Sequence, residues 1–316
     1  MRPGQVHRFA AKMLRPMAPC LRLIENRGIN QRNLVGPPPP VLFIVGAPRT
    51  GTTILFQCLT HYFDVIFPSH LAALFPLTPA FGLWLSNKIY GDRPHRAFRS
   101  LHGFSLGDGL LGPNEWETLF RKRIIPTLGK ESFSQTKSNG LSYIDRIVNY
   151  QNSKPMVLKV PLAVLHIDVL ARLIPSSKFL YVERSPLDTA RSIYRAKRRE
   201  GKPAEALWYV KPPRLLNSRF ETEADQIVAQ VLEIGQIVKE SFSKLDVSRT
   251  QSVSYENLCQ SPVSEIERIG RWLDPSVKVR PVRNLPCLVR SSSIPLSDPV
   301  LDDVLQREFG KKRGVV

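Results

Sequence analysis

The sequence contains no continuous apolar segment long enough for the core of a signal peptide or for a membrane-spanning helix. It has only four cysteines, and their spacing matches no metal site. Acidic residues are also few: 27 Asp and Glu stand against 45 Lys and Arg, a formal net charge of +18. These absences predict a cytoplasmic protein with reduced thiols and no membrane anchor. The excess of cations predicts a surface that attracts polyanions.

The chain of 316 residues is long enough for one large α/β domain, which we place at residues 41–316 after an extension of residues 1–40. Apolar residues recur in this extension at helical spacing, with Arg8, Lys12 and Arg15 on other faces. The pattern predicts a basic amphipathic helix, followed by a stiff lead-in at Pro37–Pro40. Two interpretations stay open: peripheral contact with an anionic membrane surface, or packing on the domain or on a partner subunit.

Residues 41–45 form an apolar, β-branched run that predicts a buried strand, and Gly46-Ala47-Pro48-Arg49-Thr50-Gly51 follows at once. A glycine-framed turn between a strand and a helix is typical of a loop that binds phosphate. The lysine of nucleotide triphosphatases is missing, because Thr52 and Thr53 occupy its place and the next one. The predicted strands at 156–160 and 178–184 supply no carboxylate suited to magnesium, which disfavours ATP with magnesium.

The octapeptide Gly46-Ala47-Pro48-Arg49-Thr50-Gly51-Thr52-Thr53 resembles the 5′-phosphosulfate loop, G-x-P-R-S-G-T-T, of sulfotransferases that use 3′-phosphoadenosine 5′-phosphosulfate (PAPS). A second stretch, residues 179–192, resembles the strand, loop and helix by which that family holds the 3′-phosphate. The resemblance implies that the 5′-phosphosulfate is bound by Arg49, Thr50, Gly51, Thr52 and Thr53. It implies that Arg184 and Ser192 bind the 3′-phosphate, and that no metal is required.

Three residues are candidates for the chemistry of transfer. Lys159 ends a short apolar strand that resembles the L-K-x-P strand of the family, which implies a cation near the bridging oxygen; the alternative is a lysine that reaches solvent. His70 follows a predicted strand at 63–68, and the resemblance implies a base there, although such relatives more often have Glu. A buried or capping histidine is equally expected. Glu115 is the second candidate base; as an alternative, it stabilises a helix that starts near Asn114.

Periodicity predicts helices at residues 54–61, 162–173, 189–199, 224–242 and 264–273, and a last strand before Tyr255. We expect loops and short helices over 71–112, together with the connection 203–216 that holds Trp208 and Tyr209, to contact the acceptor. Tyr255 lies in a segment that resembles the family's Y-E-x-L, which suggests either adenine contact or a core position. Residues 129–140 are predicted to form a surface loop, and Ser291–Ser293 a C-terminal donor contact.

Together these patterns predict an α/β fold: a doubly wound parallel sheet with a P-loop and helices on both faces. The implied reaction moves a sulfuryl group from PAPS to an acceptor hydroxyl or amine of a carbohydrate, lipid or small metabolite. His70 would be the base, and Arg49 and Lys159 would stabilise the transition state. Two alternatives stay open: a P-loop kinase that uses ATP, and a non-catalytic basic protein that binds an anionic surface or nucleic acid. The expected partners are the nucleotide donor and an unidentified acceptor; nucleic acid is not expected.

Overall fold

The computed structural model describes residues 3–26, 38–101, 104–128, 140–150, 154–204 and 206–281, with 285, 303, 304 and 307. The predicted contact at Ser291–Ser293 and nearly all of the predicted loop at 129–140 lie outside these residues.

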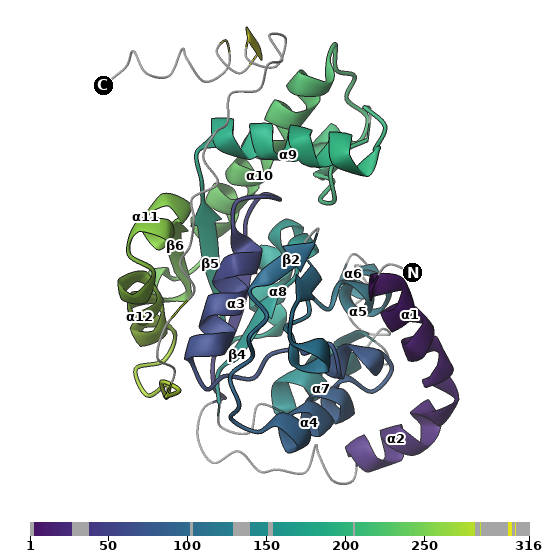
Figure 1. The fold of residues 1–316 in the computed structure, drawn as a ribbon. Helices are drawn as coiled ribbons and strands as arrows, with labels where there is room; N and C mark the ends of the chain where they lie inside the picture. The colour runs from purple at the N-terminus through teal and green to yellow at the C-terminus, as the bar shows by residue number, and fades with distance from the viewer. Residues whose placement is uncertain are drawn as a thin grey trace.

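Four parallel strands form the central sheet in the order β4-β1-β5-β6 (Figure 1). They are β1 (Val41–Val45), β4 (Met156–Lys159), β5 (Ser177–Glu183) and β6 (Thr250–Ser254). The chain runs from β1 outward to β4, then crosses back to β5 on the other side of β1. This reversal confirms the predicted doubly wound parallel sheet, and it creates a crevice at the carboxyl ends of β1 and β5.

Helices cover both faces of the sheet (Figure 1). One face is covered by helices α3 (Thr52–Tyr62), α11 (Tyr255–Gln260) and α12 (Pro262–Leu273). The other face is covered by α4 (Pro79–Tyr90), α5 (Glu117–Leu119), a π-helical turn (Phe120–Ile124), α6 (Ile125–Leu128), α7 (Gly140–Asn149), α8 (Ile167–Leu173) and the C-terminal half of α10 (Glu223–Phe242). A further helix, α9 (Pro186–Glu200), packs against α10. A separate hairpin pairs β2 (Arg99–Leu101) with β3 (Phe104–Leu106).

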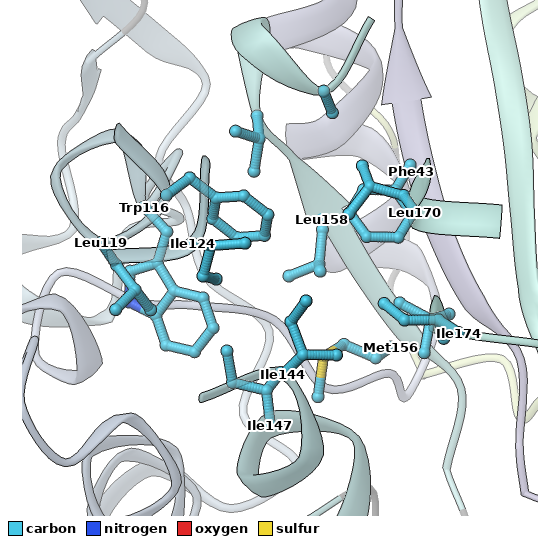
Figure 2. Packing of buried hydrophobic residues seen from close by; sticks show 14 of the residues in the cluster. Phe43, Trp116, Leu119, Ile124, Ile144, Ile147, Met156, Leu158, Leu170 and Ile174 are labelled. Atoms are coloured by element: carbon cyan, nitrogen blue, oxygen red, sulfur yellow. The ribbon is translucent and has the colours of Figure 1, made fainter. Parts of the chain in front are cut away.

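The residues of β1 alternate between two apolar cores because successive side chains of a strand point to opposite faces. Leu42 and Ile44 pack with α3, α11 and α12. Phe43 belongs to the other core, where Figure 2 shows it with Leu158 of β4 and with Trp116. All five residues of β1 are buried, as expected of the middle of a sheet that is covered on both sides.

The predicted strand at 63–68 is wrong. Ile66 makes one isolated parallel bridge to Met156, donating its amide to the Pro155 carbonyl and accepting from the Val157 amide. The pairing cannot continue as a ladder, because Pro68 has no amide hydrogen to donate. The predicted helix at 162–173 is also divided: a 3₁₀ turn at Pro161–Leu165 precedes α8.

Two helices of the N-terminal extension, α1 (Pro3–Met13) and α2 (Ala18–Ile24), lie along the outside of the body (Figure 1). His7 Nε2 lies 2.6 Å from the carbonyl oxygen of His70. Glu25 accepts a hydrogen bond from the Ala80 amide and forms a 3.0 Å ion pair with Arg146. The division of the chain at residue 40 stays a prediction. Within the described ranges, none of the helices combines the length and apolar character that crossing a bilayer requires.

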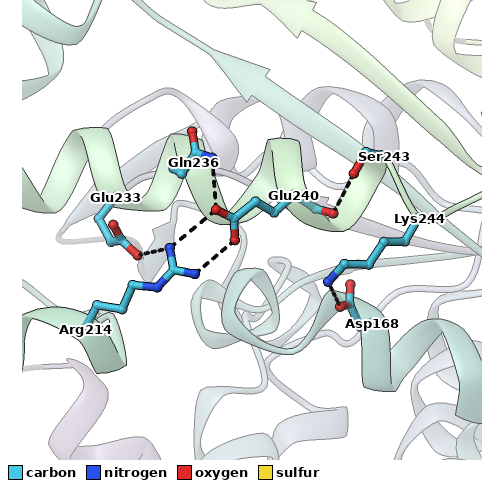
Figure 3. A network of polar contacts seen from close by, with 7 residues as sticks. All are labelled: Asp168, Arg214, Glu233, Gln236, Glu240, Ser243 and Lys244. Atoms are coloured by element: carbon cyan, nitrogen blue, oxygen red, sulfur yellow. Dashed lines mark hydrogen bonds and ion pairs between the residues drawn. The ribbon is translucent and has the colours of Figure 1, made fainter.

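An exposed ionic network runs along α10 (Figure 3). Arg214 reaches Glu233 and Glu240, and Lys244, just after the helix, forms a 2.8 Å ion pair with Asp168 of α8. Exposed pairs of this kind contribute only about 0–1 kcal/mol each. The position of α10 therefore depends mainly on its buried face.

Candidate active site

A cavity of about 230 Å³ opens at the carboxyl ends of β1, β4 and β5. This is the crevice where ligands bind in doubly wound sheets. All but two of the predicted site residues line it: Arg49, Gly51, Thr52, Thr53, Lys159, Arg184 and Ser192. The exceptions are Thr50 and His70.

The loop between β1 and α3 owes its shape to Thr50. The hydroxyl of Thr50 donates to the Ala47 carbonyl at 2.8 Å, and its amide donates to the same oxygen at 3.3 Å. Thr50 is buried, so its side chain shapes the loop and does not line the cavity. Gly51 then caps α3 with a left-handed backbone, φ = 99°. The first amides of α3, at Thr52 and Thr53, have no partner within the helix and lie at the cavity, where an anion can accept from them.

Two arginines and a serine converge on one side of the cavity. Arg49 Nε donates to Ser192 Oγ at 3.2 Å, and Arg184 Nη1 donates to the Arg49 carbonyl at 2.8 Å. The Arg184 guanidinium also lies 4.6 Å from the centroid of the Tyr255 ring. Tyr255 is buried, and its ring packs against Arg184 while it lines the cavity.

Burial lowers the pKa of Arg49, and the positive charges of Arg184 and Arg199 lower it further. Like charges held this close raise the free energy of the site until an anion binds. The two guanidinium groups and the Ser192 hydroxyl can donate hydrogen bonds to the oxygens of a phosphate or sulfate group. This side of the cavity therefore has the donor set of an anion site.

A buried ion pair forms the other side. Lys159 Nζ, at the end of β4, donates to Glu115 Oε1, and Thr53 Oγ1 donates to the same oxygen at 3.3 Å. The two charged side chains are only 7% and 14% exposed, so Lys159 is paired and does not reach solvent. Burial raises the pKa of Glu115, and the nearby Lys159 partly opposes this. A carboxylate with a raised pKa accepts a proton more readily than an ordinary one.

A turn before α5 brings Glu115 to Lys159. Asn114 Oδ1 accepts from the Trp116 amide at 2.8 Å, and the Asn114 amide donates to the Pro68 carbonyl at 2.7 Å. The helix starts at Glu117, later than the predicted start near Asn114. Asn114 thus fixes the turn that precedes the helix and presents Glu115 to the cavity.

The structure does not bring His70 to the cavity. Its Nε2 lies 2.8 Å from the Ser105 carbonyl, which accepts, and its Nδ1 lies 3.0 Å from Asn114 Nδ2, which donates. This arrangement fixes the tautomer and uses both ring nitrogens. Burial lowers the pKa of His70 to about 4. His70 is therefore a neutral structural histidine that supports the turn holding Glu115.

The loop after α9 supplies Trp208 and Tyr209 to the cavity wall, and their contact with an acceptor stays a prediction. Burial, followed by the charges of Glu200, Glu117 and Glu115, raises the pKa of Tyr209 to about 12. Gln230, on the buried face of α10, holds this loop: it accepts from the Trp208 amide at 3.2 Å and donates to the carbonyls of Trp208 and Val210. The only sign of Gln230 in the sequence is a polar residue on an apolar helix face.

Ser100 of β2 also lines the cavity, although no motif marks it. It belongs to the segment 71–112 that was expected to build the acceptor side. The cavity thus has a cationic side formed by residues that follow β1 and β5 and by Ser192 of α9, and an opposite side formed by Glu115, Lys159 and the loops.

The sequence model of the sulfotransferase family matches residues 40–278 of this chain. The chain therefore belongs to the sulfotransferase family. The matched range includes every residue described above for the cavity. A comparison with curated proteins finds no match.

Solved structures of sulfotransferases are similar to the chain at low identity. STF9 from Mycobacterium avium is 16% identical, with 80% of this chain and 67% of that one covered and a TM-score of 0.47. A sulfotransferase from Alicyclobacillus acidocaldarius is 17% identical, with 88% and 93% covered and a TM-score of 0.47. STF1 from Mycobacterium tuberculosis is 14% identical, with 86% and 89% covered and a TM-score of 0.44.

Proposed function

We propose that this protein transfers a sulfuryl group from PAPS to an acceptor hydroxyl or amine. One observation carries the proposal: a single cavity has an anion site at Arg49, Arg184 and Ser192 on one side and the buried Glu115–Lys159 pair on the other. Membership of the sulfotransferase family supports the same reaction class. The acceptor is a carbohydrate, a lipid or a small metabolite.

The donor set suits a nucleotide with phosphate groups at two places. Arg184 and Ser192 would hold the 3′-phosphate, and Arg49 with the amides of Thr52 and Thr53 would hold the 5′-phosphosulfate. Thr50 serves indirectly, since it shapes the loop. The cationic side chains supply the charge compensation that magnesium gives in phosphoryl transfer, so the proposal requires no metal.

Glu115 is the proposed base, in preference to His70. Glu115 lies in the cavity with a raised pKa, whereas both ring nitrogens of His70 are engaged elsewhere. The acceptor oxygen forms a bond to sulfur as the bond from sulfur to the bridging oxygen breaks. The acceptor proton passes to Glu115, and the electron pair of the broken bond stays on the departing phosphate. Lys159 stabilises that developing charge.

The experiment is to incubate the protein with PAPS and panels of sugars, lipid headgroups and phenols, and to measure adenosine 3′,5′-bisphosphate by chromatography. We expect acceptor-dependent release that is lost in Arg49→Ala. Turnover of ATP with magnesium, without any release from PAPS, would instead support the kinase alternative. The family match favours sulfuryl transfer over both the kinase and the non-catalytic basic protein.

A further inference from the structure

The N-terminal helices have a second apolar face that folding does not use. Their inner face is buried at Ala18 and Leu21, which pack toward the body. On the outer side, Phe9, Met13 and Met17 are 62%, 64% and 52% exposed. Phe9 and Met13 are four residues apart in α1, so their side chains are neighbours on that helix. Met17 follows in the 3₁₀ turn Arg15–Met17 that joins α1 to α2.

Leu23 and Ile24 of α2 are also exposed, at 57% and 49%. We call these five residues, Phe9, Met13, Met17, Leu23 and Ile24, the N-terminal apolar face. Single exposed apolar residues are ordinary, but a run of large ones on one short segment marks a surface that meets a partner.

The charges around the N-terminal apolar face have one sign. Lys12, Arg15 and Arg22 are exposed beside it. The only acid within residues 3–26 is Glu25, which is fully buried, paired with Arg146 and bonded to two backbone amides. The outer surface of this segment is therefore apolar and cationic, with no exposed carboxylate among residues 3–26.

We infer that the N-terminal apolar face docks on an anionic membrane surface. Phe9, Met13 and Met17 would enter the boundary between headgroups and acyl chains, and the flanking cations would meet the lipid phosphates and carboxylates. A second copy of the chain is a poorer partner, because the same cations would face one another. The inference does not depend on the proposed sulfuryl transfer.

The test is cosedimentation of the full chain with two kinds of vesicle, phosphatidylcholine alone and phosphatidylcholine with phosphatidylserine. We expect binding to the anionic vesicles that weakens with added salt. The triple variant F9S/M13S/M17S should bind at least about tenfold more weakly. The variant K12Q/R15Q should lose roughly fivefold per cation removed.

A matched control is I89S/L216S/V247S, which removes three exposed apolar side chains from other parts of the surface. We expect this variant to bind vesicles like the wild type, and circular dichroism should show that all variants are folded. Equal binding of F9S/M13S/M17S and the wild type would overturn the inference, as would no binding to anionic vesicles. A dimer in sedimentation velocity that F9S/M13S/M17S converts to a monomer would also overturn it, in favour of a second copy.

Discussion

Lys159 Nζ donates a hydrogen bond to Glu115 Oε1, and this contact joins the end of β4 to the turn before α5. It links residues 44 positions apart in the sequence. In the proposed reaction the two side chains act at opposite ends of the transfer: Glu115 takes the acceptor proton, and Lys159 stabilises the departing phosphate. Their pairing keeps both buried charges compensated before substrates bind.

Replacing Glu115 by Gln should lower the rate of sulfuryl transfer by about 10²–10⁴-fold, because the amide cannot accept the proton. Affinity for adenosine 3′,5′-bisphosphate should remain, since Glu115 bonds to the hydroxyl of Thr53 and leaves the Thr53 amide, the proposed phosphate ligand, in place. Single-turnover rates and calorimetry measure the two effects. Glu117→Gln is the control, because Glu117 pairs with Arg121 at the surface. A fully active Glu115→Gln enzyme would exclude Glu115 as the base.

The pH dependence of transfer should report the same carboxylate. Burial raises the pKa of Glu115, so its deprotonated, active form is lost as pH falls through a value above that of an ordinary glutamate. The rate should therefore rise with pH along a limb that vanishes in Glu115→Gln. A limb that persists in Glu115→Gln and disappears in His70→Gln would assign the base to His70 instead.

Acid should destabilise the fold partly through His70. Its pKa is about 4 in the folded protein against 6.5 in a model histidine, so the unfolded chain binds a proton more readily between these values. Unfolding free energy should thus decrease as pH falls from 6.5 to 4, by up to about 3 kcal/mol from this residue. Urea titrations at several pH values should show a weaker acid dependence in His70→Gln. Identical dependence in both proteins would contradict the buried, neutral histidine.

Gly51→Ala should damage the donor site. The backbone of Gly51 is left-handed, and an added Cβ would lie 2.4 Å from Tyr255 Cδ2, the ring that supports Arg184. We expect a loss of about 1–3 kcal/mol in unfolding free energy and weaker binding of adenosine 3′,5′-bisphosphate. Gly109→Ala is the matched control, because Gly109 also has a positive φ of 52° but no atom within 4 Å. Equal binding by Gly51→Ala and Gly109→Ala would show that the Tyr255 contact is unimportant.

Gln230→Ala should release the loop that holds Trp208 and Tyr209, because it removes three hydrogen bonds in a buried place. We expect a loss of about 1–3 kcal/mol in unfolding free energy and a higher acceptor KM, with donor affinity unchanged. Gln236→Ala, on the exposed network of Figure 3, should change stability by less than about 0.5 kcal/mol. Equal stability of the two variants would contradict the role given to Gln230.

Local patterns were enough to predict the sheet and the anion side of the cavity. Each of these features lies within one continuous stretch of sequence: the apolar run of β1, the glycine loop after it, and the end of β5. Their strand and anion-binding character can therefore be predicted from the sequence without knowledge of tertiary contacts. The resemblance to PAPS-dependent sulfotransferases implies one donor site for Arg49, Arg184 and Ser192, and the structure places these three residues together.

The opposite side depends on contacts between distant segments, which one sequence does not reveal. His70 and Glu115 were both candidate bases, but the bonds from His70 to Ser105 and Asn114 are long-range. The predicted strand at 63–68 failed for a related reason: its apolar pattern was strand-like, yet only Ile66 finds a partner at the sheet edge. No motif marks Gln230 or Ser100, because their roles come from tertiary packing.

The proposed function requires that the cavity bind a nucleotide carrying both a 3′- and a 5′-phosphate. The most direct test is calorimetric titration, without magnesium, with adenosine 3′,5′-bisphosphate, adenosine 5′-monophosphate and ATP. We expect micromolar binding that needs the 3′-phosphate and is lost in Arg184→Ala but kept in Arg214→Ala, a replacement on the exposed surface. Equal affinity for adenosine 5′-monophosphate, or unchanged binding in Arg184→Ala, would contradict it.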